Sequence, residues 1–111
     1  MTEFPPRPGP HDTVVVRPKG RLDMALAPAL RQELTALIES GKIRLVVDMN
    51  AVDTIDSSAL GSLVAILKIA RQAGGDLRLV APSRQVAEEL NMTNLVRVMP
   101  PYPSVESAFA V

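Results

Sequence analysis

Seven residues in the middle of the chain, Ile43 to Met49, read IRLVVDM and restrict the fold more than any other stretch. Valine and isoleucine favour strands, and the near absence of polar alternation is typical of a strand covered on both faces. Such a strand occupies the interior of a sheet that has helices packed on it. The segment therefore predicts a sheet with residues 43–49 at its centre.

The segments on either side alternate between the periods of strands and of helices. Apolar residues recur at spacings of three and four over residues 26–38 until Ser40-Gly41, and again over 60–70 until Gly74-Gly75, so each run predicts a helix. The other expected elements are strands at 13–16, 20–23, 77–80 and 96–98 and helices at 82–90 and 104–110, with strand 20–23 paired to strand 13–16. The order β-β-α-β-α-β-α-β-α predicts an α/β fold with a mixed, largely parallel sheet, right-handed crossovers and about four flanking helices.

A length of 111 residues suits one domain and is short for two. Phe4, Tyr102 and Phe109 are the only aromatic residues, so an aliphatic core is expected. Residues 1–12 hold four prolines and a glycine, which remove backbone donors and oppose regular structure. We predict a flexible proline-rich tail at residues 1–12 and one folded domain at 13–111.

The composition disfavours several classes of function. Twelve basic and twelve acidic residues balance without a long run of one sign, so no nucleic-acid partner is expected. The chain has no cysteine and one histidine, and the spacing of its aspartates matches no cation-binding loop, so neither a metal nor a cofactor is expected. The N-terminus has no signal-peptide pattern, and no apolar run is long enough to insert into a membrane. We expect a cytoplasmic protein whose partner is a protein or a small ligand.

The most distinctive polar cluster lies at residues 53–61, DTIDSSALG, between the central strand and the second long helix. Aspartate and serine are favoured N-cap residues, each contributing about 1 kcal/mol, so a helix cap is the simplest interpretation. A hydrolase is disfavoured because Ser57 lacks a Gly-x-Ser-x-Gly elbow and His11 lies in the predicted tail. A phosphate-binding P-loop is also missing. We therefore expect no catalytic residues and no enzyme.

Three sets of residues resemble the STAS domain of the bacterial anti-sigma factor antagonist (anti-anti-sigma factor) family. Val47-Asp48-Met49 followed by residues 56–61, DSSALG, is similar to the family's strand and its Asp-Ser-Ser/Thr-Gly-Leu-Gly turn. Residues 20–23, GRLD, resemble a second family turn, and Gly74-Gly75 and residues 104–108 match its later elements. The resemblance covers about residues 13–110 and implies the STAS-type α/β fold.

The resemblance also implies a function, that of an anti-sigma factor antagonist acting by partner switching. The unphosphorylated protein would bind an anti-sigma factor that is also a serine kinase, and so release the sigma factor. Phosphorylation at Ser57, with Ser58 as the second choice, would switch binding off, and a phosphatase would restore it. The residues expected to contact the partner are Asp23, Asp56, Ser57, Ser58, Ala59 and Leu60.

The chain departs from the family pattern at Ala59, where glycine is usual. A methyl group there suits a helix but would narrow the approach of a kinase if it faced Ser57. An alternative therefore stays open: a constitutive interaction module, such as a scaffold or a subunit of a transport assembly, that phosphorylation does not control.

Overall fold

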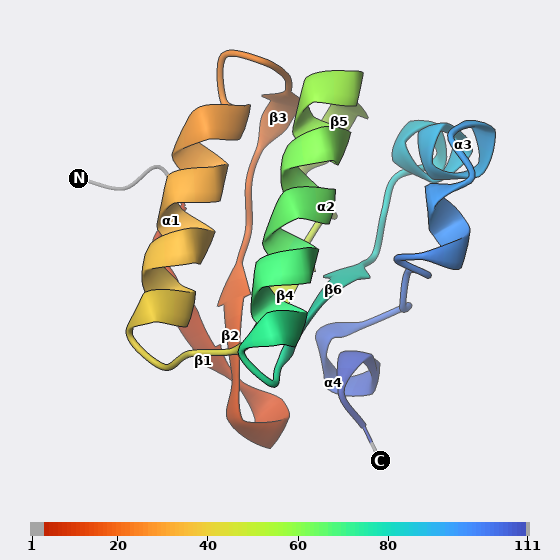
Figure 1. Cartoon of the computed structure of the whole chain (residues 1–111). Helices are drawn as coiled ribbons and strands as arrows, with labels where there is room; N and C mark the ends of the chain where they lie inside the picture. Colours follow the sequence, from red (N-terminus) through yellow and green to blue (C-terminus); the bar gives the residue numbers. More distant parts are fainter. Residues whose placement is uncertain (1–3, 111) are drawn as a thin grey trace.

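The computed structural model describes residues 4–110. Its elements in chain order are β1 (Arg7–Gly9), the 3-10 helix η1 (Pro10–Asp12), β2 (Thr13–Val16), β3 (Gly20–Leu22), α1 (Ala27–Glu39), β4 (Arg44–Asp48), β5 (Val52–Ile55), α2 (Ser57–Gln72), β6 (Asp76–Val80), α3 (Arg84–Met92), the 3-10 helix η2 (Leu95–Arg97) and α4 (Val105–Ala108). The four α-helices and the mostly parallel sheet confirm the predicted fold class (Figure 1).

The main sheet has the strand order β1-β2-β4-β6, so β4 lies in its interior. Strands β2 and β6 both run parallel to β4, whereas β1 is antiparallel to β2. The three central residues of β4, Leu45, Val46 and Val47, are fully buried. The prediction that residues 43–49 form a central strand covered on both faces is confirmed.

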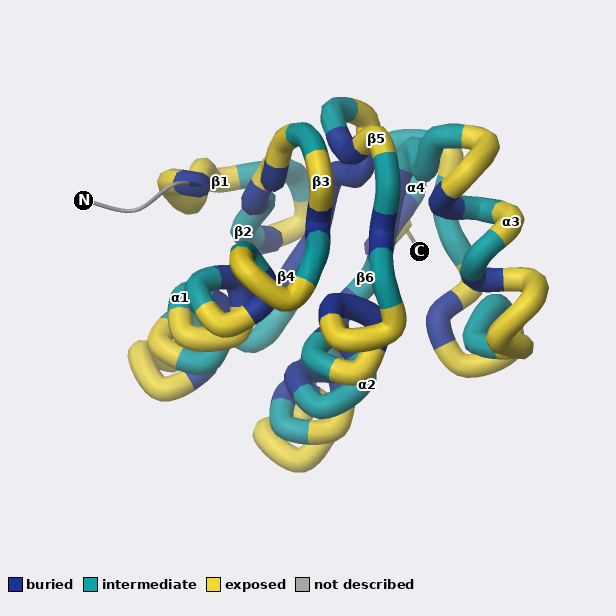
Figure 2. Tube along the Cα trace, turned by 90° about the horizontal axis from the view of Figure 1, so that it is seen from above, coloured by how far each residue is buried: buried dark blue, intermediate teal, exposed yellow. Residues whose placement is uncertain are grey.

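The two faces of this sheet have different covers. Helices α1 and α2 lie side by side on one face, and α4 lies on the opposite face (Figure 2). Leu45 and Val47 belong to the large core under α1 and α2, while Val46 joins a smaller cluster with Val80, Ala108 and Phe109. Because successive side chains of a strand point to opposite faces of the sheet, β4 contributes residues to both cores.

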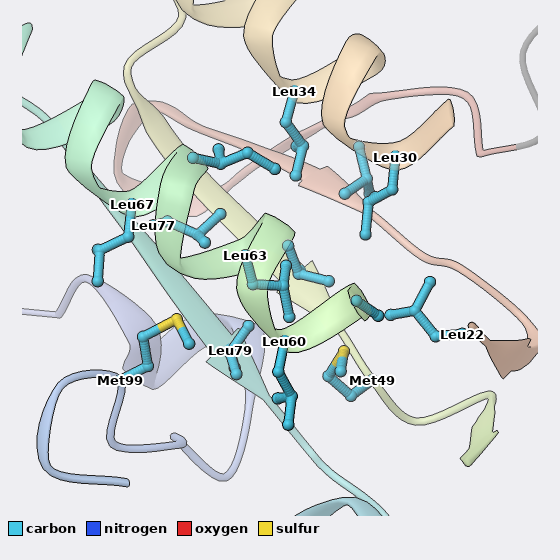
Figure 3. Close-up of a cluster of buried hydrophobic side chains, with 14 of the residues drawn as sticks. Leu22, Leu30, Leu34, Met49, Leu60, Leu63, Leu67, Leu77, Leu79 and Met99 are labelled. Carbon is cyan, nitrogen blue, oxygen red and sulfur yellow. The ribbon is translucent and has the colours of Figure 1, made fainter. Parts of the chain in front are cut away.

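The large core is aliphatic, as the composition predicted. Leu60, Leu63 and Leu67 lie at helical spacing on the inner side of α2, facing Leu77 and Leu79 of β6 (Figure 3). All of these side chains are at most 2% exposed. Burial of a leucine side chain stabilises a fold by roughly 1.5–3 kcal/mol, so this face of α2 is held firmly in place.

The predicted pairing of strand 20–23 with strand 13–16 is wrong. Strand β3 pairs instead with β5, in parallel, and the two form a separate small sheet. Pro18 follows β2 and Gly20 has a φ of +73°, a conformation that glycine adopts without strain, so the chain leaves the main sheet before β3 begins. The short segment Val52–Ile55 was not predicted as a strand.

The predicted last strand at residues 96–98 is also wrong. Residues 95–97 form the 3-10 helix η2, which begins after Asn94 in the left-handed conformation. Further along, Tyr102 makes a single bridge to Val80 at the edge of the main sheet. Prolines at positions 100, 101 and 103 have no N–H to donate, so a longer strand cannot form there.

The expected flexible tail at residues 1–12 needs correction for the part that the structure describes, residues 4–12. Arg7–Gly9 form β1, which pairs with Thr13–Val15 of β2, and Phe4 is 3% exposed and packs in the large core. Proline is tolerated in an edge strand, because one side of such a strand needs no donors. Residues 1–3 lie outside the described residues.

Candidate functional site

The two parallel strands of the small sheet end beside each other and bring distant segments together. Leu22 of β3 lies opposite Ile55 of β5, and the N–H of Asp56 donates to the carbonyl oxygen of Leu22 over 3.1 Å. The loop before α1 and the start of α2 therefore lie side by side (Figure 1). The two motifs singled out in the sequence, residues 20–23 and 56–61, meet at this point.

Asp56 is the N-cap of α2 and also joins the two segments. One carboxylate oxygen, Oδ1, accepts from the N–H of Ala59 over 2.9 Å, which is the cap bond. The other, Oδ2, accepts from the N–H of Met24 over 3.0 Å. A single carboxylate thus holds the start of α2 against the loop before α1. The helix cap expected within residues 53–61 is confirmed, and the bond to Met24 is additional.

Asp23 closes the turn that leads into α1. Its Oδ1 accepts from the N–H groups of Ala25 and Leu26 over 3.1 and 3.3 Å. Its backbone carbonyl oxygen accepts from Leu26 and Ala27. Asp23 is partly exposed and directly precedes Met24, whose N–H donates to Asp56, so the two acidic residues lie near each other.

Ser57 is the first residue of α2 and, like Ser58, is exposed. The first N–H groups of a helix have no partner within the helix. Within residues 4–110, no oxygen accepts a hydrogen bond from the N–H of Ser57 or of Ser58. One turn on, Gly61 is exposed, and a methyl group built there would meet no atom within 4 Å. Both hydroxyl groups can therefore be approached from solvent.

Two residues expected at the partner surface are not available to a partner. Ala59 is 0% exposed and Leu60 is 2% exposed, and both pack in the large core. The helical period explains this, since positions 59, 60, 63 and 67 share the inner side of α2. The methyl group of Ala59 points into the core, so it does not narrow the approach to Ser57.

Met24 is the surface residue that the sequence did not indicate. The residue is 71% exposed, and its backbone N–H donates to the carboxylate of Asp56, which is next to Ser57. No periodic pattern marks it, because it stands in a turn between two elements. Only the pairing of β3 with β5 places it beside the serines.

The structure also places the residues considered for catalysis and for metal binding. His11 lies in η1 at the amino end of β2, and Figure 1 shows this segment at the opposite end of the molecule from the start of α2, so no Ser-His-Asp triad forms. Asp48 is buried and paired with Arg17 over 2.8 Å. In the described part of the chain, no three His, Cys, Asp or Glu residues form a group that would hold a metal ion. Over the same residues, no helix has the length and apolar character needed to span a membrane.

Comparison with known proteins identifies the class of domain to which this fold belongs. The STAS domain family matches residues 5–108, so the chain belongs to that family. The match begins within the segment that was expected to be a tail, in agreement with the position of β1 in the main sheet.

Within the family, the chain is similar to anti-sigma factor antagonists. A candidate antagonist of Thermotoga maritima is 30% identical over 98 residues, which is 87% of each chain. The anti-sigma-B factor antagonist of Bacillus subtilis is 33% identical over 76 residues, covering 68% of this chain and 69% of that protein. A crystal structure of a candidate anti-sigma factor antagonist from Thermotoga maritima has a TM-score of 0.86 at 29% identity, over 95% of this chain and 90% of that chain.

Proposed function

We propose that this protein is a cytoplasmic antagonist of an anti-sigma factor, controlled by phosphorylation of Ser57. In the unmodified state it binds the anti-sigma factor through the surface formed by Asp23, Met24, Asp56, Ser57 and Ser58, and the sigma factor is released. A serine kinase, which the family resemblance implies is the anti-sigma factor itself, phosphorylates Ser57 and ends this binding. A phosphatase returns the protein to its active state.

The exposure of Ser57 at the first position of α2 is the observation that carries the proposal. The hydroxyl stands in solvent, and the helix behind it is fixed by the core residues of α2 and by the Asp56 cap. A kinase therefore meets the serine on a rigid element, and unfolding of the helix is not required. The buried methyl group of Ala59 leaves this approach open.

The site is suited to carry a phosphate once it is attached. The carboxylate of Asp56 already accepts from Ala59 and Met24, so the N–H groups of Ser57 and Ser58 remain as donors within the described residues. These groups and the positive end of the helix dipole stabilise an anion at the start of α2. The phosphorylated protein should therefore fold as well as the unmodified one.

The same phosphate changes what the surface presents to a partner. Phosphorylation adds a charge of about −1.5 to −2 next to the carboxylates of Asp23 and Asp56. A partner surface that accommodates two carboxylates and an uncharged hydroxyl then faces a dense negative charge. In a closed interface the phosphate would lose its hydration and lie against the carboxylates of Asp23 and Asp56, and its bulk would prevent the close contact at the hydroxyl, so the partner is released.

The family motif favours Ser57 over Ser58 as the residue that is phosphorylated, and both serines are exposed. Peptide mass spectrometry of the protein from its native cell, with and without phosphatase treatment, distinguishes them. We expect one phosphate, localised to Ser57. Localisation to Ser58 alone would move the switch by one residue, and no phosphate under any growth condition would favour a constitutive interaction module.

Partner binding is tested with substitutions at Ser57 in tagged protein recovered from the same cells. We expect Ser57→Ala to retain the serine-kinase anti-sigma factor and Ser57→Asp to lose it. Gln72→Glu is the matched control, because it adds one negative charge at the exposed last residue of α2, away from the site. Equal recovery with Ser57→Ala and Ser57→Asp would contradict phosphorylation control.

A further inference from the structure

We propose a second interaction surface on the opposite side of the sheet from Ser57, which takes an acidic segment of a partner protein. A groove of about 460 Å³ lies between the N-terminal segment, residues 4–10, and the first turn of α4. Val15 and Val105 form part of its lining, and the side chains of Arg7, Arg17, Lys19 and Glu106 also line it. We call this the N-terminal groove.

The position of the groove separates it from the phosphorylation surface. Val15 and Val105 both pack on the smaller core, which includes Val46 and Ala108 and lies on the α4 side of the sheet. Figure 2 shows α4 on one side of the main sheet and α2, which begins with Ser57, on the other. The main sheet thus separates a partner in the N-terminal groove from one at Ser57.

The charge of the groove selects an acidic occupant. Three cationic side chains line it against the single carboxylate of Glu106. Arg17 pairs with Asp48 but keeps 59% of its side chain exposed, and over residues 4–110 neither Arg7 nor Lys19 forms an ion pair. The Ser57 surface carries Asp23 and Asp56, so the same acidic segment would be repelled there. The two surfaces therefore suit partners of opposite charge.

The shape and chemistry of the groove indicate how such a segment is held. Pro8 lies in the edge strand β1 and has no N–H, so an added strand would lack a regular ladder of hydrogen bonds. Contact is therefore made by side chains. Apolar residues of the partner lie on Val15, Val105 and the prolines, and its carboxylates reach Arg7 and Lys19. A segment in which acidic and apolar residues alternate satisfies both requirements.

The test uses the full chain and a fluorescein-labelled peptide of four Asp-Leu repeats, with four Lys-Leu repeats as the charge control. We expect the acidic peptide alone to bind, with an affinity that falls as ionic strength is raised, since exposed charges are screened. The double variant Arg7→Glu, Lys19→Glu should weaken binding about tenfold or more. The matched variant Arg31→Glu, Lys68→Glu changes the net charge equally at exposed residues of α1 and α2 and should bind within about twofold of the wild type.

Nuclear magnetic resonance locates the bound peptide. The amide signals of Val15, Lys19 and Val105 should shift on titration, while those of Ser57 and Ser58 stay in place. Equal weakening by the two double variants, shifts centred on α2, or no preference for the acidic peptide would each overturn the proposal. Both variants should also show the wild-type thermal melting, because all four substituted residues are exposed.

Discussion

Replacing Asp56 with alanine tests the structural centre of the site without reference to any partner. The substitution removes the cap bond to Ala59 and the bond to Met24 together. Loss of an N-cap side chain costs typically about 1 kcal/mol. The bond to Met24 is exposed to solvent, so its net contribution is about 0.5 kcal/mol, the low end for a hydrogen bond. We expect Asp56→Ala to lower the free energy of unfolding by about 1.5 kcal/mol.

Urea unfolding followed by circular dichroism measures this change. With a slope of about 1.5 kcal/mol per molar urea for a domain of this size, the midpoint should fall by about 1 M. Asp56→Asn should lie between the alanine variant and the wild type, because asparagine caps a helix but has one carbonyl oxygen for two N–H groups. Protection of the Met24 and Ala59 amides against hydrogen exchange should fall in the alanine variant.

Asp53→Ala is the matched control. Asp53 is exposed and lies three residues before Asp56, and its carboxylate accepts no hydrogen bond from any group of residues 4–110. Its effect should stay within about 0.5 kcal/mol, as for most surface substitutions. If Asp56→Ala were no more destabilising than Asp53→Ala, the inference that one carboxylate joins α2 to the loop before α1 would be refuted.

Two further predictions concern residues whose role the fold revealed. Phe4→Ala should lower the free energy of unfolding by about 3 kcal/mol in the same urea assay, because it removes a buried aromatic side chain from the core; a change below about 0.5 kcal/mol would mean that residues 4–12 are a dispensable tail. Ala59→Gly should cost about 1.5 kcal/mol through lost helix propensity and a lost buried methyl group, yet leave the rate of Ser57 phosphorylation by the kinase unchanged. Faster phosphorylation of the glycine variant would show that the methyl group does limit access to Ser57.

Local pattern was sufficient for the long elements and for the central strand. The apolar run at residues 43–49 and the helical spacings in α1 and α2 each extend over several residues. Many positions therefore indicate the same element. Short elements lack this redundancy. Residues 96–98 have the composition of a strand, but residues 95–97 form the 3-10 helix η2, which begins after Asn94 in the left-handed conformation.

The local sequence predicted only those parts of the site that depend on neighbouring residues. The Asp56 cap and the exposed serine at the start of α2 follow from the local motif, since an N-cap acts within one turn of its own helix. The inward orientation of Ala59 and Leu60 was also present in the helical period of α2, but the family motif drew attention to them as surface residues.

By itself, the sequence determined the α/β class, the central strand, the capped start of α2 and the position of Ser57, because these depend on residues close together in the chain. The tertiary structure alone placed Met24 against Asp56, brought Phe4 and β1 into the domain and formed the N-terminal groove. Each of these features joins segments far apart in sequence, such as β3 with β5 or residues 4–10 with α4. Such contacts depend on strand pairing and on packing across the sheet, which local propensity does not specify.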